Sequence, residues 1–304
     1  MVSGNKAREL RVWTVGILLT ALTSMGATYR TENFEVHAPS PQIAEAAAKT
    51  AEHHRKALAE AWLGKELPPW KSRCVVQVEI GDMPSAGHTT FLFERGEVFG
   101  WEMAVRGPLD AVLDSVLPHE VSHTVFASYF RMPLPRWADE GAATLSEHEA
   151  ERRRQRLRVE QLLQRQRPIP LRKLLSMTDY PPAHQTMLAL YAQSYSLCEF
   201  LVESHGRSTY IKFLQDAHKN GWDEALRTTY GFANVEACEK GWNDWVLAGS
   251  PLRGEGQSRL LNVQKSAPAE TPQGVSTASL GSQTTPQPED LLNGVPPVES
   301  GAAR

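Results

Sequence analysis

The chain has 304 residues, of which 41% are hydrophobic and 22% charged, and its formal net charge is -3. It is long enough for one large domain or two small ones and apolar enough to build a core. The nearly balanced charge argues against a nucleic-acid-binding protein, which usually has a basic excess. The three cysteines (Cys74, Cys198 and Cys238) are too few for a disulfide scaffold and match no zinc-finger spacing. We expect them to be small buried side chains, with oxidation of one pair as the alternative.

Residues 1–27 have the composition and order of an export signal. A positive segment comes first, with Lys6, Arg8 and Arg11. The mostly apolar stretch that follows, over residues 12–22, is shorter than the roughly 20 residues that a membrane span needs. We therefore expect a cleaved signal peptide, and a protein that is periplasmic, in the cell envelope or secreted. The alternative is an uncleaved N-terminal anchor as the one attachment to a membrane, because Met25 is a poor residue three positions before a cut after Ala27.

Residues 28–107 predict an αβ subdomain. Alternating apolar residues and β-branched runs indicate strands. Ser40 followed by Pro41 is typical of a helix start, and the Ala-rich segment after them ends at Gly64. The predicted elements are a strand over 34–38, a helix over 41–62, a strand over 74–80 and a hairpin with strands over 89–93 and 98–105.

Residues 108–248 are almost entirely helical in pattern and predict a second subdomain. Within it, residues 149–167 interleave many arginines with glutamates, so we interpret this segment as a solvated helix face; an anion-binding patch is the alternative. Residues 249–304 are rich in Pro, Ser, Gly, Gln and Thr and predict a disordered tail. The other predicted features are helices over 191–204 and 208–218, separated by Gly206, and core anchors at Trp242, Trp245 and Val246.

The decisive motif is His119-Glu120-Val121-Ser122-His123, an H-E-x-x-H. On a helix the two histidines share one face and can reach the same ion. Glu120 lies beside them and can act on a water molecule without being a ligand, so the motif combines a metal that lowers the pKa of water with a base that takes its proton. Chance produces such a motif only about 0.01 to 0.03 times in a chain of this length. Two buried, hydrogen-bonded histidines without a metal are the alternative.

The motif lies in a segment with helical periodicity. Proline lacks a backbone donor and clashes with the preceding turn, so we expect a kink or a fresh helix start at Pro118. The apolar stripe that predicts the helix consists of Val112, Val116, His119, His123, Phe126 and Phe130, at steps of three or four residues.

A third ligand is predicted downstream of the motif. A catalytic zinc site needs three protein ligands and one open position. Residues 132–135 (Met-Pro-Leu-Pro) predict a chain reversal, and a second helix beginning near Arg136 would return Glu140 toward the histidines. The small residues that follow, beginning with Gly141, would let two helices approach closely. The metzincin arrangement is excluded, because Tyr129 stands where its third histidine would fall.

H-E-x-x-H followed by W-x-D-E-G-x-A resembles the gluzincin metallopeptidases and, more narrowly, the exported bacterial proteins of the peptidase MA-like family. The likeness covers roughly residues 30–248, including the Tyr-Ala-Gln-Ser segment that begins at Tyr191. It implies an α+β, thermolysin-like core, in which a small mixed sheet with a long helix precedes a mainly helical lower part. It implies that an edge strand of the sheet binds an extended peptide, and the 89–105 hairpin fits strand addition, although it could equally be an ordinary edge. The site residues that the resemblance implies are His119, His123 and Glu140 as zinc ligands and Glu120 as general base.

One position departs from the gluzincin pattern. Many gluzincins carry a carboxylate one turn after the third ligand, where it orients a histidine. Here that position is Thr144. Asp139 is a neighbouring carboxylate, but on a helix it points about 100° away from Glu140. The residue that orients the histidines is therefore left unassigned.

The sequence predicts a zinc-dependent peptidase with a peptide or protein substrate, and Zn2+ is inferred from the ligand types. The oxyanion of the transition state needs a fixed donor, for which Tyr191 is our first choice and Tyr195 and His184 are alternatives. One rival function is a zinc-binding recognition or scaffold module without hydrolysis, which the missing carboxylate favours and the intact Glu120 opposes. Another is a structural envelope protein tethered by its N-terminus, in which the motif is incidental.

Overall fold

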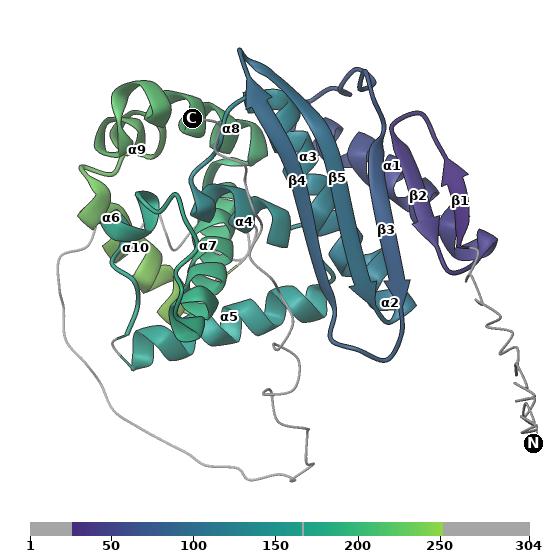
Figure 1. The fold of residues 1–304 in the computed structure, drawn as a ribbon. Helices are drawn as coiled ribbons and strands as arrows, with labels where there is room; N and C mark the ends of the chain where they lie inside the picture. Colours follow the sequence, from purple (N-terminus) through teal and green to yellow (C-terminus); the bar gives the residue numbers. More distant parts are fainter. Residues whose placement is uncertain (1–25, 166, 252–304) are drawn as a thin grey trace, which may run out of the picture.

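The computed structural model describes residues 26–165 and 167–251. Of the expected export signal, only residues 26 and 27 are described, and of the expected tail, only residues 249–251. The rest of both segments lies outside the described residues. The α+β fold class is confirmed, since a mixed sheet precedes a mainly helical part (Figure 1). The elements are β1 (Ala27–Arg30), β2 (Phe34–Ala38), α1 (Pro41–Leu63), β3 (Cys74–Ile80), β4 (Ala86–Glu94), β5 (Glu97–Gly107), α2 (Leu109–Ala111), the π-helical turn η1 (Val112–Val116), α3 (Leu117–Phe130), α4 (Arg136–Thr144), α5 (Glu149–Gln164), α6 (Leu171–Leu175), α7 (His184–His205), α8 (Arg207–Asn220), α9 (Trp222–Tyr230) and α10 (Val235–Leu247).

The sheet has the strand order β1-β2-β3-β5-β4. β2, β3 and β5 run parallel, whereas β1 and β4 are antiparallel to their neighbours. The hairpin of β4 and β5 bends at a register shift between Thr90 and Leu92, where Gly100 has the positive φ of 68° that suits a bulge. Within the described part of the chain β4 pairs only with β5, so it is an edge strand, and Figure 1 shows it at the side of the sheet nearest to the helices of the lower part.

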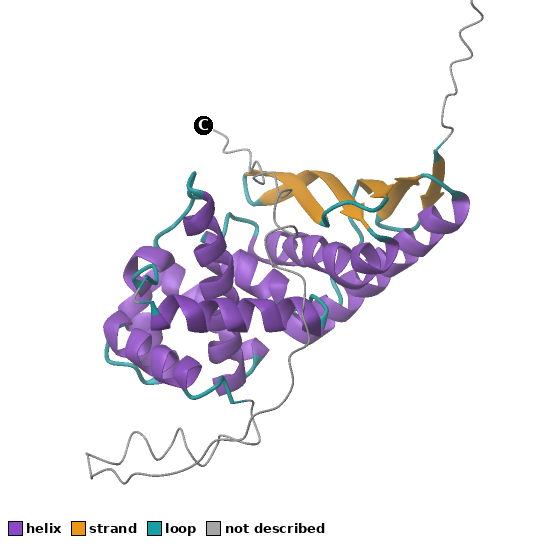
Figure 2. Cartoon of the chain, turned by 90° about the horizontal axis from the view of Figure 1, so that it is seen from below, coloured by secondary structure: helices purple, strands orange, loops and turns teal. Residues whose placement is uncertain are grey.

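Helix α1 begins and ends as its sequence predicts. The Ser40 hydroxyl accepts a hydrogen bond from the Ile43 N–H at 3.3 Å, and Pro41 occupies the first helical position. Gly64 ends the helix with a φ of 72°. Alanines line its buried face, so the helix lies close beneath the sheet, and Figure 2 shows helices on only one of the two faces of the sheet.

Two groups of buried side chains form the interior. One lies between the sheet, α1 and α3, and the other joins the helices of the lower part. Helix α3 contributes to both, with Val121 and Val125 beneath the sheet and Phe126 in the helical group. Because α3 has side chains in both groups, the buried side chains do not separate the two parts. The expected subdomain boundary after residue 107 stays a prediction.

Several expectations about the lower part are met. In α5 only Val159 is buried, and Arg156 pairs with Glu149 and Glu199, so the segment is a solvated, charge-paired face. Gly206 separates α7 from α8. The three expected core anchors, Trp242, Trp245 and Val246, are buried. The three cysteines are also buried, and none of them forms a disulfide. In the described part of the chain no helix has the length and apolar character needed to cross a membrane.

Candidate metal centre

The two histidines of the motif come from α3, which follows a π-helical turn. The Leu117 N–H donates to the Val112 carbonyl, five residues earlier, so the chain widens just before the proline. Pro118 follows directly after this turn as the second residue of α3. The chain is helical without a break from Leu109 to Phe130, so the kink or fresh helix start expected at Pro118 takes the form of a π turn just before the proline.

His119, His123 and Glu140 form one cluster between α3 and α4. One ligand atom from each lies within 4.8 Å of the others. Glu140 Oε2 is 3.3 Å from His119 Nε2 and 4.0 Å from His123 Nε2. Glu140 is only 1% exposed, and a carboxylate buried so deeply needs a positive partner or a metal ion. The three predicted ligands are therefore close enough to hold a metal ion.

The position of Glu140 depends on the glycine that follows it. A Cβ on Gly141 would collide with the backbone oxygen of Ser194 and would lie 2.8 Å from Cys198 Cβ, both on α7. Helix α4 thus packs against α7 so closely that no residue larger than glycine fits at position 141. This confirms the expectation that small residues after Glu140 let two helices approach closely.

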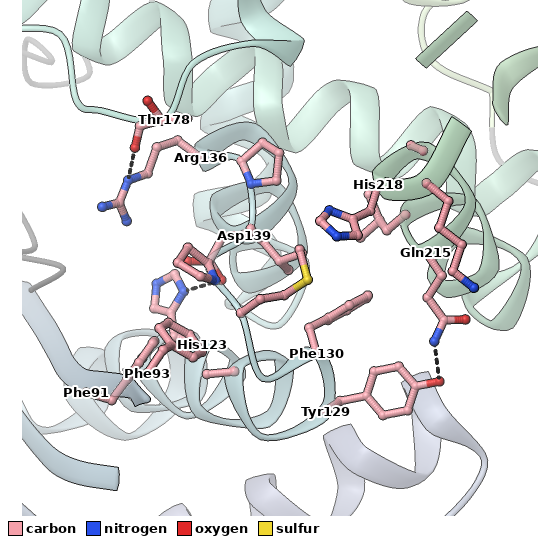
Figure 3. A pocket seen from close by; sticks show the side chains of 18 of the residues that line it. Phe91, Phe93, His123, Tyr129, Phe130, Arg136, Asp139, Thr178, Gln215 and His218 are labelled. Atoms are coloured by element: carbon pink, nitrogen blue, oxygen red, sulfur yellow. Dashed lines mark hydrogen bonds and ion pairs between the residues drawn. The ribbon is translucent and has the colours of Figure 1, made fainter. Parts of the chain in front are cut away.

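Each histidine has a carboxylate at its outer nitrogen. Glu147 Oε1 lies 2.6 Å from His119 Nδ1. Asp139 Oδ1 lies 2.9 Å from His123 Nδ1, the pair joined by a dashed line in Figure 3. At His119 this contact is a hydrogen bond, which keeps the ring proton on Nδ1 and leaves Nε2 to face an ion; at His123 the carboxylate lies within ion-pair distance of Nδ1. The two imidazoles are therefore oriented for coordination through Nε2.

The residue that orients the histidines, which the sequence left unassigned, is a carboxylate at each of them. Thr144, one turn after Glu140, donates its hydroxyl to the Glu140 backbone carbonyl at 2.9 Å, and Glu147 lies just beyond it in the turn after α4. Asp139 and Glu140 are successive residues of α4 and therefore point in directions about 100° apart around the helix, as expected. An imidazole ring presents its two nitrogens on different edges, so neighbouring residues of α4 can meet the two edges of His123.

The carboxylates also control the protonation of the cluster. Burial by itself would lower the pKa of both histidines, but the facing carboxylates outweigh it. The pKa of His123 rises to about 8, chiefly through Asp139, and that of His119 rises well above its ordinary value through Glu140 and Glu147. Burial would raise the pKa of Glu140, yet the two histidines lower it to about 2. Without a metal, the cluster is a network of protonated imidazoles and carboxylates.

The cluster fits a divalent metal ion of borderline softness. His123 Nε2 and Glu140 Oε2 are buried and make no hydrogen bond to any described residue. Unsatisfied buried polar atoms are costly, and one ion, on displacing the proton of the imidazole, would satisfy both. Two imidazoles and one carboxylate are a frequent ligand set of catalytic zinc, although the donor types alone do not separate zinc from neighbouring metals.

The edge strand β4 holds Glu120 beside the cluster. Thr89 donates its hydroxyl to Glu120 Oε2 at 2.7 Å. Gly87 approaches the same carboxylate so closely that a Cβ there would lie 2.5 Å from Glu120 Oε1. Glu120 is 4% exposed. A buried carboxylate that is not one of the three clustered ligands is thus fixed between the histidines' helix and the edge of the sheet.

Tyr191 lies close to the cluster, and a second tyrosine lies with it. The rings of Tyr191 and Tyr180 stack with their centroids 6.4 Å apart. Burial raises the pKa of Tyr191, and the charges of Glu140 and Glu120 raise it further. Tyr180, which sequence reasoning missed, donates its hydroxyl to Glu140 Oε1. It precedes two prolines in the loop after α6, a pattern that gives no sign of a metal site.

The two alternative donors lie elsewhere. Tyr195 donates its hydroxyl to Glu199 at 2.6 Å, next to the guanidinium of Arg156. His184 is exposed at the first residue of α7. Of the three candidates, the structure places only Tyr191 next to the tyrosine that contacts a predicted ligand.

One of the comparisons with known proteins bears on this cluster. No curated protein matches the chain. Residues 110–248 match the model of the Peptidase MA superfamily. The matched segment contains α3, α4 and the whole His119–His123–Glu140 cluster, together with Tyr191. The part of the chain that forms the candidate metal centre is therefore similar to the Peptidase MA superfamily.

Proposed function

We propose that the chain is a zinc-dependent peptidase of the gluzincin type, with His119, His123 and Glu140 as ligands and Glu120 as general base. The observation that carries the proposal is the placement of Glu120. It is a buried carboxylate beside the cluster, and it takes no part in the set of ligand atoms. A site that only binds a metal has no use for such a group, whereas hydrolysis requires it.

In this proposal a zinc ion, when bound, supplies a Lewis acid that acidifies water and polarises the peptide carbonyl. Glu120 takes a proton from the attacking water while its Oε2 accepts the Thr89 hydroxyl. The same carboxylate then donates that proton to the departing amine. Thr89 and Gly87 hold the carboxylate in place between these two steps.

The substrate class we propose is an extended peptide added to the free edge of β4. This strand is the last of the sheet and carries the residue that binds the base. A peptide paired with its backbone would pass directly in front of Glu120, and main-chain hydrogen bonds would place the scissile carbonyl. We assign the oxyanion donor to Tyr191, whose partner Tyr180 touches Glu140.

The rival function, a metal-binding module without hydrolysis, loses the observation that favoured it. That observation was the absence of a carboxylate to orient the histidines, and Asp139 and Glu147 occupy this role.

We also propose that the peptidase acts outside the cytoplasm, because residues 1–27 have the pattern of an export signal. Cell fractionation with an antibody against the chain tests this location, and retention of the protein in the cytoplasm would exclude it.

The test of hydrolysis compares three zinc-loaded full-length proteins on a fluorescently labelled, denatured protein substrate. They are the parent, Glu120→Gln, and the matched control Glu60→Gln on the exposed side of α1. We expect the parent and the control to cleave equally and Glu120→Gln to lose at least about 100-fold at equal metal content. Equal cleavage by Glu120→Gln would refute the assigned base. Bound zinc without cleavage in any of the three would favour the binding module.

A further inference from the structure

A cavity of about 670 Å3 opens beside the metal centre. It shares Thr89, His123 and Asp139 with the site described above, and otherwise extends away from it (Figure 3). Its walls come from β4, the C-terminal end of α3, the loop 132–135 and α8. Its size lies within the range of pockets that bury a substrate group.

The lining of the cavity is largely apolar. Phe91 and Phe93 from β4 face aromatic side chains at the end of α3, and Met132 and Leu134 come from the chain reversal between α3 and α4. Several of the polar groups in the wall already have partners. Asp139 holds His123, and Gln215 donates to the Tyr129 hydroxyl at 3.2 Å (Figure 3). The basic side chains of His218 and Lys219 in the α8 wall are exposed, so it is the part of the cavity between β4, the end of α3 and the loop 132–135 that favours an apolar occupant.

The edge strand connects the cavity to the base. Thr89, Phe91 and Phe93 alternate along β4, so their side chains share one face of the strand. Thr89 contacts Glu120, and the two phenylalanines continue along the cavity toward the end of the strand. A peptide lying on the edge of β4 would present one side chain to the cavity a few residues from the bond in front of Glu120.

The direction of the peptide decides which side of the scissile bond the cavity reads. Antiparallel pairing is the commoner arrangement of neighbouring strands, and β4 already pairs in this way with β5. In an antiparallel peptide, the residues beside Phe91 and Phe93 precede those beside Thr89. We propose that the cavity is a specificity pocket for a large aliphatic or aromatic side chain on the amino side of the scissile bond; this rests on the proposed peptidase function.

Binding and cleavage are measured separately, so that the two proposals can fail independently. Zinc-loaded Glu120→Gln is titrated calorimetrically with acetylated hexapeptide amides that differ at one position, which is Gly, Leu, Phe or Lys. The parent is given the same peptides, and its cleavage sites are mapped by mass spectrometry. We expect the Leu and Phe peptides to bind about 10- to 100-fold more tightly than the Gly peptide, the effect of burying one such side chain. We expect cleavage on the carboxyl side of that residue.

A charge in the wall tests the cavity itself. Met132→Glu places a carboxylate on a half-buried loop position of the lining, and Leu157→Glu makes the same kind of change on the exposed face of α5. Met132→Glu, made in the Glu120→Gln protein, should reverse the preference from Phe to Lys, and Leu157→Glu should leave it unchanged.

The outcomes separate the two proposals. A preference for Leu and Phe that Met132→Glu reverses, without cleavage by the parent, supports the pocket and refutes hydrolysis. Cleavage with no preference among the four peptides, or with the preference on the carboxyl side of the bond, overturns the pocket assignment and leaves hydrolysis standing. Absence of both binding and cleavage overturns both.

Discussion

Gly87 offers the sharpest test of how the fold positions the general base. The residue lies on β4 and is not among the residues with a left-handed φ, so the backbone accepts alanine there without strain. The added Cβ would lie 2.5 Å from Glu120 Oε1, 2.7 Å from Val116 Cγ1 and 2.8 Å from Glu120 Cγ. Since ordinary contacts begin at 3.4 Å, the carboxylate has to move by about 0.9 Å.

A displacement of about 1 Å can cost about 100-fold in rate. We therefore expect Gly87→Ala to lower kcat about 100-fold, equivalent to about 2.7 kcal/mol of activation free energy, while zinc affinity stays unchanged, because the substitution touches none of the three ligands. The assay measures hydrolysis of a fluorogenic peptide at saturating zinc, zinc affinity by chelator competition, and the melting temperature. The matched control is Gly81→Ala, where the added methyl group meets only the flexible end of Met83.

Two results would refute this reasoning. If Gly87→Ala keeps its kcat within about threefold while folded and zinc-loaded, then the position of the Glu120 carboxylate does not limit the reaction. If kcat falls only in proportion to bound zinc, then the substitution acts on the metal and not on the base. A loss in Gly81→Ala of the same size would show that alanine disturbs the sheet in general.

Four further predictions follow from the cluster and its surroundings. Gly141→Ala should lower the free energy of unfolding by about 1–3 kcal/mol in a urea titration, because its methyl group collides with the α7 backbone, and an unchanged midpoint would contradict that close approach. Asp139→Asn should weaken zinc binding about 10- to 100-fold in chelator competition, because His123 Nδ1 loses its carboxylate; equal affinity would mean that this contact does not orient the ring. The pKa of His123 is about 8 in the folded, metal-free protein and 6.5 ordinarily, so protonated His123 stabilises the fold fully below pH 6.5, and this contribution is lost as the pH rises through 8; the melting temperature of the metal-free protein should fall over this range. Zinc binding at pH 7 should release protons, measured by calorimetry in two buffers with different heats of ionisation, and an identical heat in both buffers would disprove the release. Tyr191→Phe should lower kcat about 10- to 1000-fold at full zinc content whereas Tyr195→Phe should not, and equal rates in the two variants would remove the oxyanion role from Tyr191.

The sequence by itself determined the features that depend on neighbours along the chain. A cap at Ser40 and a glycine at position 64 give the limits of α1, and the alternation of residues 74–80 gives β3 with its observed ends. The spacing of His119 and His123 requires that they share a face once the segment is helical. The small residue after Glu140 was sufficient to predict a close helix crossing, because no other residue type permits one.

Only the tertiary structure decided which side chains meet across elements. The crossing of α3 and α4 brings Asp139 and Glu147 to the outer nitrogens of the histidines, and helical periodicity within α4 pointed away from this answer. Thr89 and Tyr180 lie 31 and 40 residues from the groups they bind, in segments whose patterns describe only a strand and a loop. Periodicity reports which face of an element is buried. It does not report what that face meets, because the contact depends on how the helices cross and on the order of the strands.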